Sequence, residues 1–392
     1  MNSPLQDPRF LRDPYPAYAE LRSTCPVQHV PTGFDGYGSY LVTGYAEARQ
    51  ALGDPRLSKD TAAFFADKPS PRRLHPAVAQ TMLAVDPPRH TRLRRLVTKA
   101  FTSGAVAGLR PYIAQVTDAL LDRWPAGGEV DLVAGLAEPL PVTVICELLG
   151  VPETGRPDVR RWSAELFAAG EPDLIDAASH ALANYLTELI AARRRQPGEA
   201  LLDRLISARD GGEGLSEDEL VSLAVLLLVA GHETTTHFLG NAVLALLRHP
   251  AELARLRANP DSVPAALDEL LRFDSPVGTA TFRYATEDLL LGDTPVPAGT
   301  PVQVSPGAAN RDPERFPAPD RLDLDRDASG HVAFGHGIHR CLGAPLARAE
   351  AEIALRAVLT RFPRLRLAVP PDRLRWRHTR LMRGLVSLPL LT

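Results

Sequence analysis

The sequence predicts a mainly α-helical protein with a few small β-sheets, folded as a single domain over residues 1–392. Helical periodicity covers most of the chain, whereas the segments with strand character are short. No Gly/Ser tract, charge block or fixed-period repeat divides the 392 residues into separate units. The hydrophobic fraction of 45% and charged fraction of 23% are typical of a globular protein that buries a large core.

The elements follow one another along the chain in a clear order. Helices are expected at residues 16–23, 45–52, 89–100, 105–124, 139–149, 175–195, 200–209, 217–248, 251–259, 262–273 and 344–361. Strands are expected at residues 39–42, 281–284, 289–291, 300–304 and 386–390. Many helices with a few short hairpins indicate an α-rich fold rather than a doubly wound sheet.

One predicted helix is unusually long. Ser216 and Glu219 form a capping-box pattern at its start, and Pro250 ends it. About 32 residues at 1.5 Å per residue give a rod of roughly 48 Å. Its first half is apolar on nearly all sides, so we expect it to be buried. The apolar run at 220–230 is too short to span a bilayer.

Charge and cysteine content exclude several classes of function. A formal net charge of −3 argues against nucleic acid as the main partner. Three cysteines (Cys25, Cys146 and Cys341) do not make a disulfide framework and suit a reducing cytoplasm. Residues 1–18 show neither a signal peptide nor a membrane anchor. We therefore expect a cytoplasmic protein without a membrane partner.

The strongest chemical signal is a glycine-rich loop around Cys341. Residues 334–343 read FGHGIHRCLG and lead directly into the predicted helix at 344–361. Unpaired amides and the helix dipole at such a terminus favour a thiolate, which is a strong metal ligand. A lone intracellular cysteine is usually a packing residue, but packing does not require three glycines around it. His339 adds a polar donor two residues before the thiol.

A second signal lies inside the long helix, where residues 230–235 read AGHETT. Glycine costs about 0.5–1 kcal/mol in a helix interior, and a buried acid costs more unless it has a partner. The purely structural alternative is a kink in which Thr234 bonds back to a carbonyl. We expect the kink to be present and functional. His232 and His237 are assigned to packing or solvent.

Together these patterns resemble cytochromes P450. The loop matches F-G-x-G-x-H-x-C-x-G, the helix matches A/G-G-x-D/E-T, and Glu269 and Arg272 match E-x-x-R. The motif sequences are similar to those of soluble actinobacterial members that tailor macrolides and polyketides. The resemblance implies the cytochrome P450 fold, with the long central helix over a haem and the cysteine loop below it.

The resemblance also implies a cofactor site for haem b, iron protoporphyrin IX. Cys341 would be the axial thiolate and the metal ligand. Cations at His90, Arg94, Arg283 and His339 would bind the propionates. The remaining cofactor-binding residues would be Phe334, Gly335, Gly343, Ala230 and Gly231.

By the same match, Ala230 and Gly231 leave room for O2 and substrate. Glu233 and Thr234 correspond to the acid–alcohol pair that supplies protons for O–O cleavage. Glu269, Arg272 and Arg321 would form a structural triad without a catalytic role. An E-x-x-R pair alone is most often a surface salt bridge.

The implied reaction is insertion of one oxygen atom from O2 into a C–H bond or an alkene. The chain lacks G-x-G-x-x-G after a strand, so electrons are expected from a separate ferredoxin and ferredoxin reductase. A basic docking face is expected near Arg340, Arg348 and the helix at 89–99, on a monomeric protein. A peroxide-using enzyme or a non-enzymatic haem sensor would not need Glu233 and Thr234.

The substrate is expected to be a bulky, largely apolar secondary metabolite of the macrolide or polyketide kind. Fatty acids, terpenoids, steroids and xenobiotics remain alternatives, and hydroxylation is not separated from epoxidation. The expected pocket residues are mostly apolar: Phe64, Phe65, Met82, Phe167, Leu227, Val277 and Met382.

Overall fold

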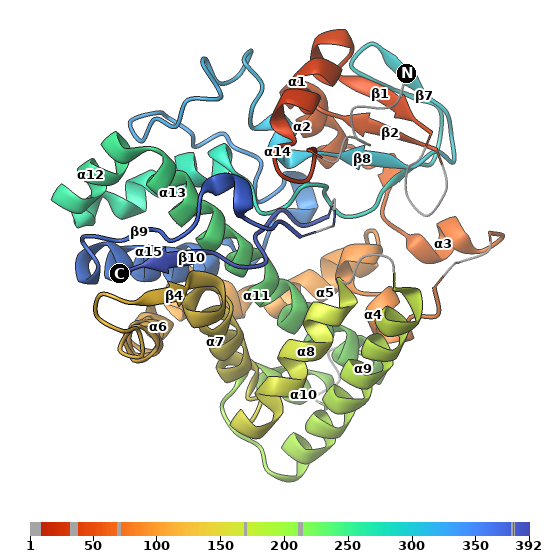
Figure 1. The fold of residues 1–392 in the computed structure, drawn as a ribbon. Coiled ribbons are helices and arrows are strands. Elements are labelled where there is room, and N and C mark those ends of the chain that lie inside the picture. The colour runs from red at the N-terminus through yellow and green to blue at the C-terminus, as the bar shows by residue number, and fades with distance from the viewer. Residues whose placement is uncertain are drawn as a thin grey trace.

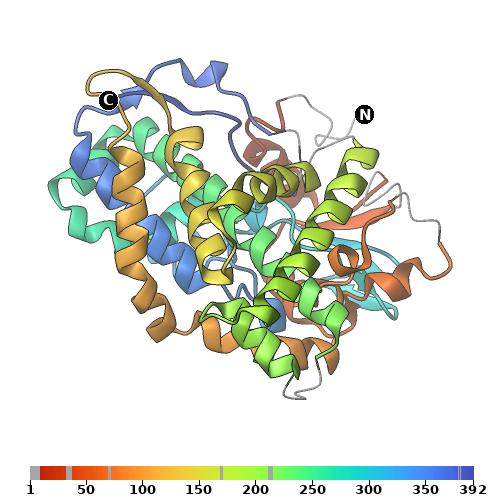
Figure 2. The same ribbon diagram turned by 90° about the horizontal axis from the view of Figure 1, so that it is seen from below.

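One long helix runs through a mass of shorter helices in the computed structural model, and small sheets lie at the edges (Figure 1). The structure describes residues 9–31, 38–68, 72–167, 171–210, 215–377, 379 and 381–392. Residues 1–8, on which part of the N-terminal prediction falls, lie outside the described residues. Seen from below, strands β1, β2, β7 and β8 lie together on one side and helices fill the rest (Figure 2).

Helix α11 (Glu217–Arg248) is the centre of the helical part. It packs against α7 (Pro139–Leu149), α15 (Ala344–Arg361), α9 (Pro172–Arg195) and α4 (Pro76–Ala79). The capping box at Ser216 and Glu219 is formed in both directions, as the sequence predicts. The helix is long and apolar enough to cross a membrane, yet 78% of its most apolar window is buried inside the protein. It is therefore a core helix.

The predicted kink does not interrupt this helix. Residues 217–248 are assigned to α-helix throughout, and Gly231 and Thr234 lie within it. The neighbours of Gly231 explain why a glycine stands there: a Cβ atom would lie 2.7 Å from Cγ1 of Ile145 on α7. The glycine thus permits the close approach of two helices.

The other predicted helices form within a few residues of their expected bounds. They are α1 (Tyr15–Thr24), α2 (Tyr45–Gly53), α5 (Arg89–Thr98), α6 (Ser103–Leu121), α10 (Leu201–Asp210), α12 (Pro250–Ala258) and α13 (Val263–Phe273). Helices that the sequence did not predict are α3 (Thr61–Phe65), α8 (Arg156–Leu166) and α14 (Pro306–Ala309), together with α4. Three of these four have five residues or fewer, too short for a periodic signal.

The sheets join segments that are distant in sequence. Strands β1 (Val27–Val30) and β2 (Ser39–Val42) pair antiparallel, and β2 pairs parallel with β8 (Val302–Val304). Strand β10 (Pro389–Leu391) lies between β4 (Glu129–Asp131) and β9 (Arg366–Leu367). A two-stranded hairpin joins β6 (Leu289–Leu291) and β7 (Thr294–Val296).

The predicted strand at 281–284 is largely wrong. The strand β5 comprises only Tyr284 and Ala285, because these two residues find ladder partners in β3 (Leu57–Ser58). The preceding Phe282 joins an aromatic group with Phe64 and Tyr284. The short β3–β5 pair holds the chain before α3 beside the segment that carries Arg283.

Candidate functional site

The loop before α15 presents Cys341 on a tightly folded backbone. The Cys341 amide donates to the carbonyl of Phe334 at 2.8 Å. Gly335 and Gly337 have φ values of 73° and 72°, a region that favours glycine. A Cβ atom on Gly337 would lie 2.8 Å from the carbonyl oxygen of Leu52, so this glycine also lets α2 approach the loop.

The Cys341 thiol experiences opposing influences. Burial raises its pKa, whereas hydrogen bonds from the backbone amides of Gly343 and Ala344 and the charges of Arg340 and Arg94 lower it; the net pKa is raised. The thiol lies among many protein atoms, yet the residue keeps accessible surface. A sulfur that faces an internal space is both surrounded by protein atoms and accessible. The amides at the start of α15 are placed to stabilise a thiolate there.

The second part of the site is a buried carboxylate on α11. Glu233 is buried, and Thr234 beside it is half-buried. Oε1 of Glu233 lies 3.6 Å from Nε2 of His232, and its Oε2 lies 3.5 Å from Nε2 of His237. Arg377 approaches from the segment between β9 and β10, with Nη1 3.9 Å from Oε2.

These contacts correct the assignment of His232 and His237 to packing or solvent. Both side chains are buried and face the one acidic side chain in this part of the helix. Sequence reasoning missed them because helical spacing puts residues four apart on one face, but does not show which pairs will be desolvated.

Burial raises the pKa of Glu233, but the imidazoles of His232 and His237 lower it by more, so the net pKa lies below the usual range. The carboxylate is thus held in its charged form. Burial also lowers the pKa of His237, with a further decrease from Arg377 and an opposing increase from Glu233. The pair is therefore an ionised acid against a neutral imidazole at neutral pH.

A group of buried basic side chains lies near the cysteine loop. The rings of His90 and His339 have centroids 4.1 Å apart. Both nitrogens of each ring, and Nη1 of Arg283, are buried without a hydrogen-bond partner among the described residues. Lys59 is buried beside them and donates to the Thr281 hydroxyl. Lys59 was not predicted from the sequence, because a single lysine after a short strand carries no distinguishing pattern.

The pKa values of these groups show that burial disfavours their charged forms. Burial lowers the pKa of His339 to about 2, with further decreases from Lys59, His90, Arg283 and Arg94. Burial lowers the pKa of Arg283 to about 10 and holds that of Lys59 well below its usual range. A cluster of buried donors without acceptors is suited to an anionic group.

Arg94 has a different environment from the other predicted propionate ligands. Its Nη2 donates to the carbonyl of Arg340 at 2.7 Å. Burial lowers the Arg94 pKa, and the charge of Cys341 raises it. Arg94 therefore also ties α5 to the loop that carries the cysteine.

A third charged group is fully satisfied. Arg272 and Glu269 are buried and form two hydrogen bonds, from Nε to Oε2 at 2.6 Å and from Nη2 to Oε1 at 2.8 Å. Nη1 of Arg272 donates to the carbonyls of Asn310 and Pro319. This pair links α13 to the irregular segment before the cysteine loop.

The prediction of Arg321 as the third member is wrong. Its side chain is 72% exposed and lies 3.8 Å from Asp323. Arg326 takes the place, with Nε 3.3 Å from Oε1 of Glu269 and only 12% of its side chain exposed. The carbonyl of Arg321, not its guanidinium, faces Arg272. An irregular segment has no periodicity that would indicate which of its arginines points inward.

Comparisons with known proteins decide the family. The family profile described as Cytochrome P450 matches residues 171–389. The chain is 49% identical over 391 residues to Cytochrome P450 107B1 of Saccharopolyspora erythraea, covering 98% of this chain and 96% of that one. It is 46% identical to the monooxygenase PikC of Streptomyces venezuelae, covering 97% and 91%. The structure of the tirandamycin C-bound P450 monooxygenase TamI matches with a TM-score of 0.92 and 48% identity, each chain covered to 98%.

The chain belongs to the cytochrome P450 family. The predicted family, fold and enzyme class are thereby confirmed, and the protein is a P450 monooxygenase. The family implies a haem held by a cysteine thiolate. The residues described above fit that group: the Cys341 sulfur receives backbone hydrogen bonds, and buried nitrogen atoms without partners, from segments distant in sequence, lie beside the same loop.

The predicted substrate residues lie in four places in the P450. Met82 and Leu227 lie in the main apolar core. Val277 and Met382 pair as an isolated β-bridge. Phe64 and Phe65 pack with Phe282. Phe167 is half-buried at the end of α8.

Some cations of the expected docking face are already bound within the P450. Nε of Arg89 and Nη2 of Arg92 lie 3.0 Å and 2.6 Å from Glu219 at the start of α11. Arg348 pairs with Asp268. Arg340 is exposed on the cysteine loop. Arg89 and Arg92 thus hold α5 to the start of α11, and the docking face stays a prediction.

Glu350 on α15 is a further buried acid that the sequence did not indicate. It is fully buried, and neither carboxyl oxygen has a hydrogen bond of good geometry among the described residues. Burial raises its pKa to about 8, against a smaller decrease from the Thr235 hydroxyl on α11. Glu350 is therefore a neutral carboxylic acid at pH 7.

Proposed function

We propose that this P450 binds haem b through Cys341 and inserts one oxygen atom from O2 into a bulky, largely apolar secondary metabolite. The single observation that carries the cofactor site is the group of unpartnered buried donors on His90, His339 and Arg283 beside the cysteine loop. Lys59 adds a further buried basic side chain to that group. Two propionates would supply the missing negative charge.

The residues of this chain have distinct tasks in that reaction. The thiolate-bound haem, when present, activates O2 and supplies the oxidising chemistry. The amides of Gly343 and Ala344 hold the charge on the Cys341 sulfur. The Glu233 carboxylate is the proton acceptor in a buried part of α11. The Thr234 hydroxyl next to it would be the proton donor to the bound ligand.

Relatives support a macrolide-like or polyketide-like substrate. The chain is 43% identical to 6-deoxyerythronolide B hydroxylase of Saccharopolyspora erythraea and 43% identical to mycinamicin IV hydroxylase/epoxidase of Micromonospora griseorubida. Met82, Leu227, Val277 and Met382 provide apolar surface for such a molecule. We further propose a separate ferredoxin with its reductase as electron donor, a monomeric protein and a cytoplasmic location.

The cofactor assignment is tested by the spectrum of the reduced protein with CO. A Soret band in the region expected for thiolate ligation supports Cys341 as the ligand. Cys341→His should move the band to the region of histidine ligation. A wild-type band in that region would overturn the assignment.

The substrate class is tested by a binding screen that records the low- to high-spin shift of the haem. Macrolides and linear polyketides are compared with fatty acids, terpenoids and steroids of similar size. A shift and NADPH-dependent oxygenation with macrolides alone would support the proposal. Turnover restricted to fatty acids or terpenoids would replace it with the alternative class.

The proton-supply role is tested with Thr234→Ala and Glu233→Gln. Both variants should keep the CO spectrum but release a larger share of the electrons as hydrogen peroxide. A non-enzymatic haem sensor would show neither turnover nor any effect of these changes. Unchanged coupling in both variants would refute the role of the pair.

A further inference from the structure

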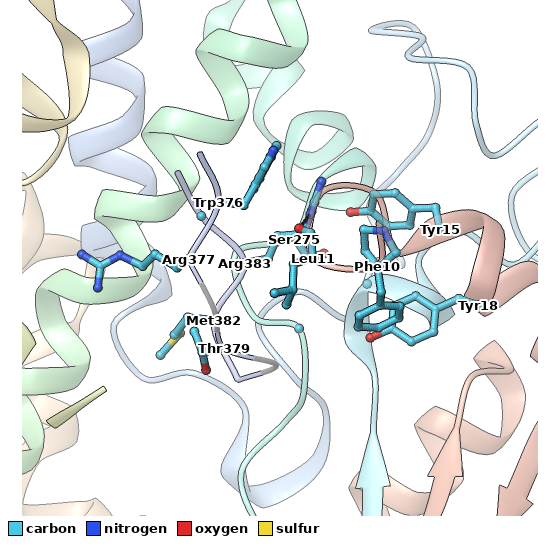
Figure 3. A pocket seen from close by; sticks show the side chains of 14 residues that line it. Phe10, Leu11, Tyr15, Tyr18, Ser275, Trp376, Arg377, Thr379, Met382 and Arg383 are labelled. Carbon is cyan, nitrogen blue, oxygen red and sulfur yellow. Dashed lines mark hydrogen bonds between the residues drawn. The ribbon is translucent and has the colours of Figure 1, made fainter. Parts of the chain in front are cut away.

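The buried Glu233 carboxylate has a connection to the protein surface that its own helix does not provide. A pocket opens between the N-terminal segment and the segment at 376–384, and Tyr15, Trp376, Arg377 and Gly384 are among the residues that line it (Figure 3). In Figure 3 the Arg377 side chain points away from Tyr15 and Tyr18. Its guanidinium reaches Oε2 of Glu233.

His237 spans the distance between this pocket and the carboxylate. Its Nε2 lies 3.5 Å from Oε2 of Glu233. Its Nδ1 faces Gly384, where a Cβ atom would overlap with the ring. Gly384 lines the pocket, and its carbonyl accepts from the Arg377 amide at 3.0 Å. One ring nitrogen thus faces the carboxylate and the other faces the pocket wall.

The environment of His237 favours exchange over permanent binding. The ring is buried, and Nε2 has no hydrogen bond of good geometry among the described residues. The charged and titratable groups that face it are Glu233 and His232 on α11 and Arg377 on the segment between β9 and β10. No backbone carbonyl fixes either nitrogen in one tautomer within the described residues.

His232 provides a natural contrast on the same helix. Its Nε2 lies 3.6 Å from the other oxygen of Glu233, so its contact with the carboxylate is similar. Its Nδ1, however, lies 2.8 Å from the carbonyl oxygen of Leu228. That contact commits Nδ1 to the helix backbone as a donor. His232 therefore contacts Glu233 but has no free nitrogen that could take up a proton from outside.

We propose that His237 and Arg377 form the solvent side of the proton supply to Glu233, with His237 as the relay and Arg377 as the residue that positions the carboxylate. A proton from water in the pocket enters at Nδ1, and the proton on Nε2 passes to Oε2 of Glu233. The ring carries one proton before and after the transfer, and exchange with water restores the first tautomer. No electron moves in this step. The inference rests on the proposed role of Glu233 and Thr234.

The first test is the tautomer state of the two histidines in the CO complex of the reduced holoenzyme. Protein labelled with ¹⁵N-histidine is examined by NMR, and the signals are assigned with His237→Gln and His232→Gln. His232 should show a fixed Nδ1–H tautomer. His237 should show averaged tautomers and an N–H that exchanges at least tenfold faster in D2O. A fixed tautomer with equal protection at His237 would overturn the proposal.

The second test compares the two variants during turnover of the substrate identified in the screen. His237→Gln keeps a donor near Glu233 but removes the relay, so product formation should fall by about tenfold and its solvent isotope effect should rise. His232→Gln is the matched control, and its solvent isotope effect should equal that of the wild type. Equal isotope effects in all three proteins would also overturn the proposal.

A third variant tests whether the effect of His237→Gln is purely structural. Arg377→Met leaves the ring intact but frees Oε2, so the pH profile of product formation should shift while the His237 tautomers still average. If Glu233→Gln alone changes coupling, the proposed function stands and the relay is wrong. If Glu233→Gln has no effect, the proposed role of Glu233 in proton supply is wrong, and the relay that rests on it is wrong as well.

Discussion

Two buried charged groups in this P450 differ in how their charges are balanced. In the group around Glu269, two arginines meet one carboxylate and several backbone carbonyls, so nearly every polar atom has a partner. In the group around His339, the buried side chains of His90, Arg283 and Lys59 lie near its ring. The nearest acid, Asp86, is already bound by the Lys59 amide and the Ser58 hydroxyl.

The difference separates a structural group from a ligand site. A satisfied cluster contributes rigidity and loses stability if one member is removed. An unsatisfied cluster costs folding free energy until a ligand brings the opposite charge. Both groups lie beside the cysteine loop, so location alone does not distinguish them. The number of hydrogen-bond and ion-pair partners of their polar atoms does.

The largest effect is expected at the satisfied group. Arg272→Met leaves the Glu269 carboxylate buried with fewer donors, and should lower the free energy of unfolding by about 3–5 kcal/mol. Urea denaturation of the haem-loaded protein measures this. Arg321→Met is the matched control, because that side chain is 72% exposed, and it should change the value by less than about 0.5 kcal/mol. Equal effects of the two changes would restore Arg321 to the triad.

Glu350 extends the comparison to a buried acid without a cation. Its folded pKa of about 8 exceeds the ordinary 4.5. Between these pH values the folded protein keeps the proton that the unfolded chain has lost. Stability from this group is therefore complete below pH 4.5, decreases as pH rises, and is lost above pH 8.

Glu350→Gln removes that titration. The variant should be more stable than the wild type by up to about 5 kcal/mol at pH 9, since each of the roughly 3.5 pKa units corresponds to about 1.4 kcal/mol. The difference should vanish near pH 4.5. Thermal unfolding of both proteins across this range is the measurement, and parallel pH curves would show that Glu350 does not keep its proton.

The unsatisfied group should respond in haem affinity. Arg283→Met and Lys59→Met each remove one charge-assisted contact, worth about 1.5–3 kcal/mol, so haem should leave roughly tenfold faster or more. Transfer of haem to an excess of apomyoglobin measures the rate. Arg95→Met, which changes an exposed cation on α5, is the control. Unchanged haem loss in the Lys59 variant would remove Lys59 from the site.

The smallest effect is expected where charges balance at the surface. Arg92→Gln breaks one of two contacts to Glu219, and Arg92 is 32% exposed. The free energy of unfolding should fall by only about 0.2–1 kcal/mol, and less at high salt. Chemical denaturation at low and high salt tests this. A loss as large as that of Arg272→Met would mean that exposure does not distinguish the two kinds of pair.

Much of the fold was predictable because its long elements have strong local signals. The bounds of α7, α11 and α15 agree with the predicted ranges, since caps, prolines and long apolar faces mark them. Helices α3, α4 and α14 are stabilised by their surroundings and carry little periodicity. The strand at 281–284 failed for a similar reason, because pairing with β3 depends on a distant segment.

The candidate site divides in the same way. Cys341, Glu233 and the Glu269–Arg272 pair lie in motifs whose spacing is local. Lys59 and Arg377 act through contacts across more than a hundred residues, and Arg326 lies in a segment without regular structure. His237 is only four residues from Glu233, but its burial against Gly384 also depends on a distant segment. Sequence order does not show which of several nearby cations is desolvated. That property emerges only when the elements pack.

The segment at 376–384 that covers Glu233 also has a consequence for the way the protein is made. Helix α11 leaves the ribosome long before this segment and before β10, which closes the sheet with β4. During synthesis the acid on α11 faces solvent, or a chaperone, without its arginine. The dry environment of the carboxylate is therefore among the last features to appear in a newly made molecule.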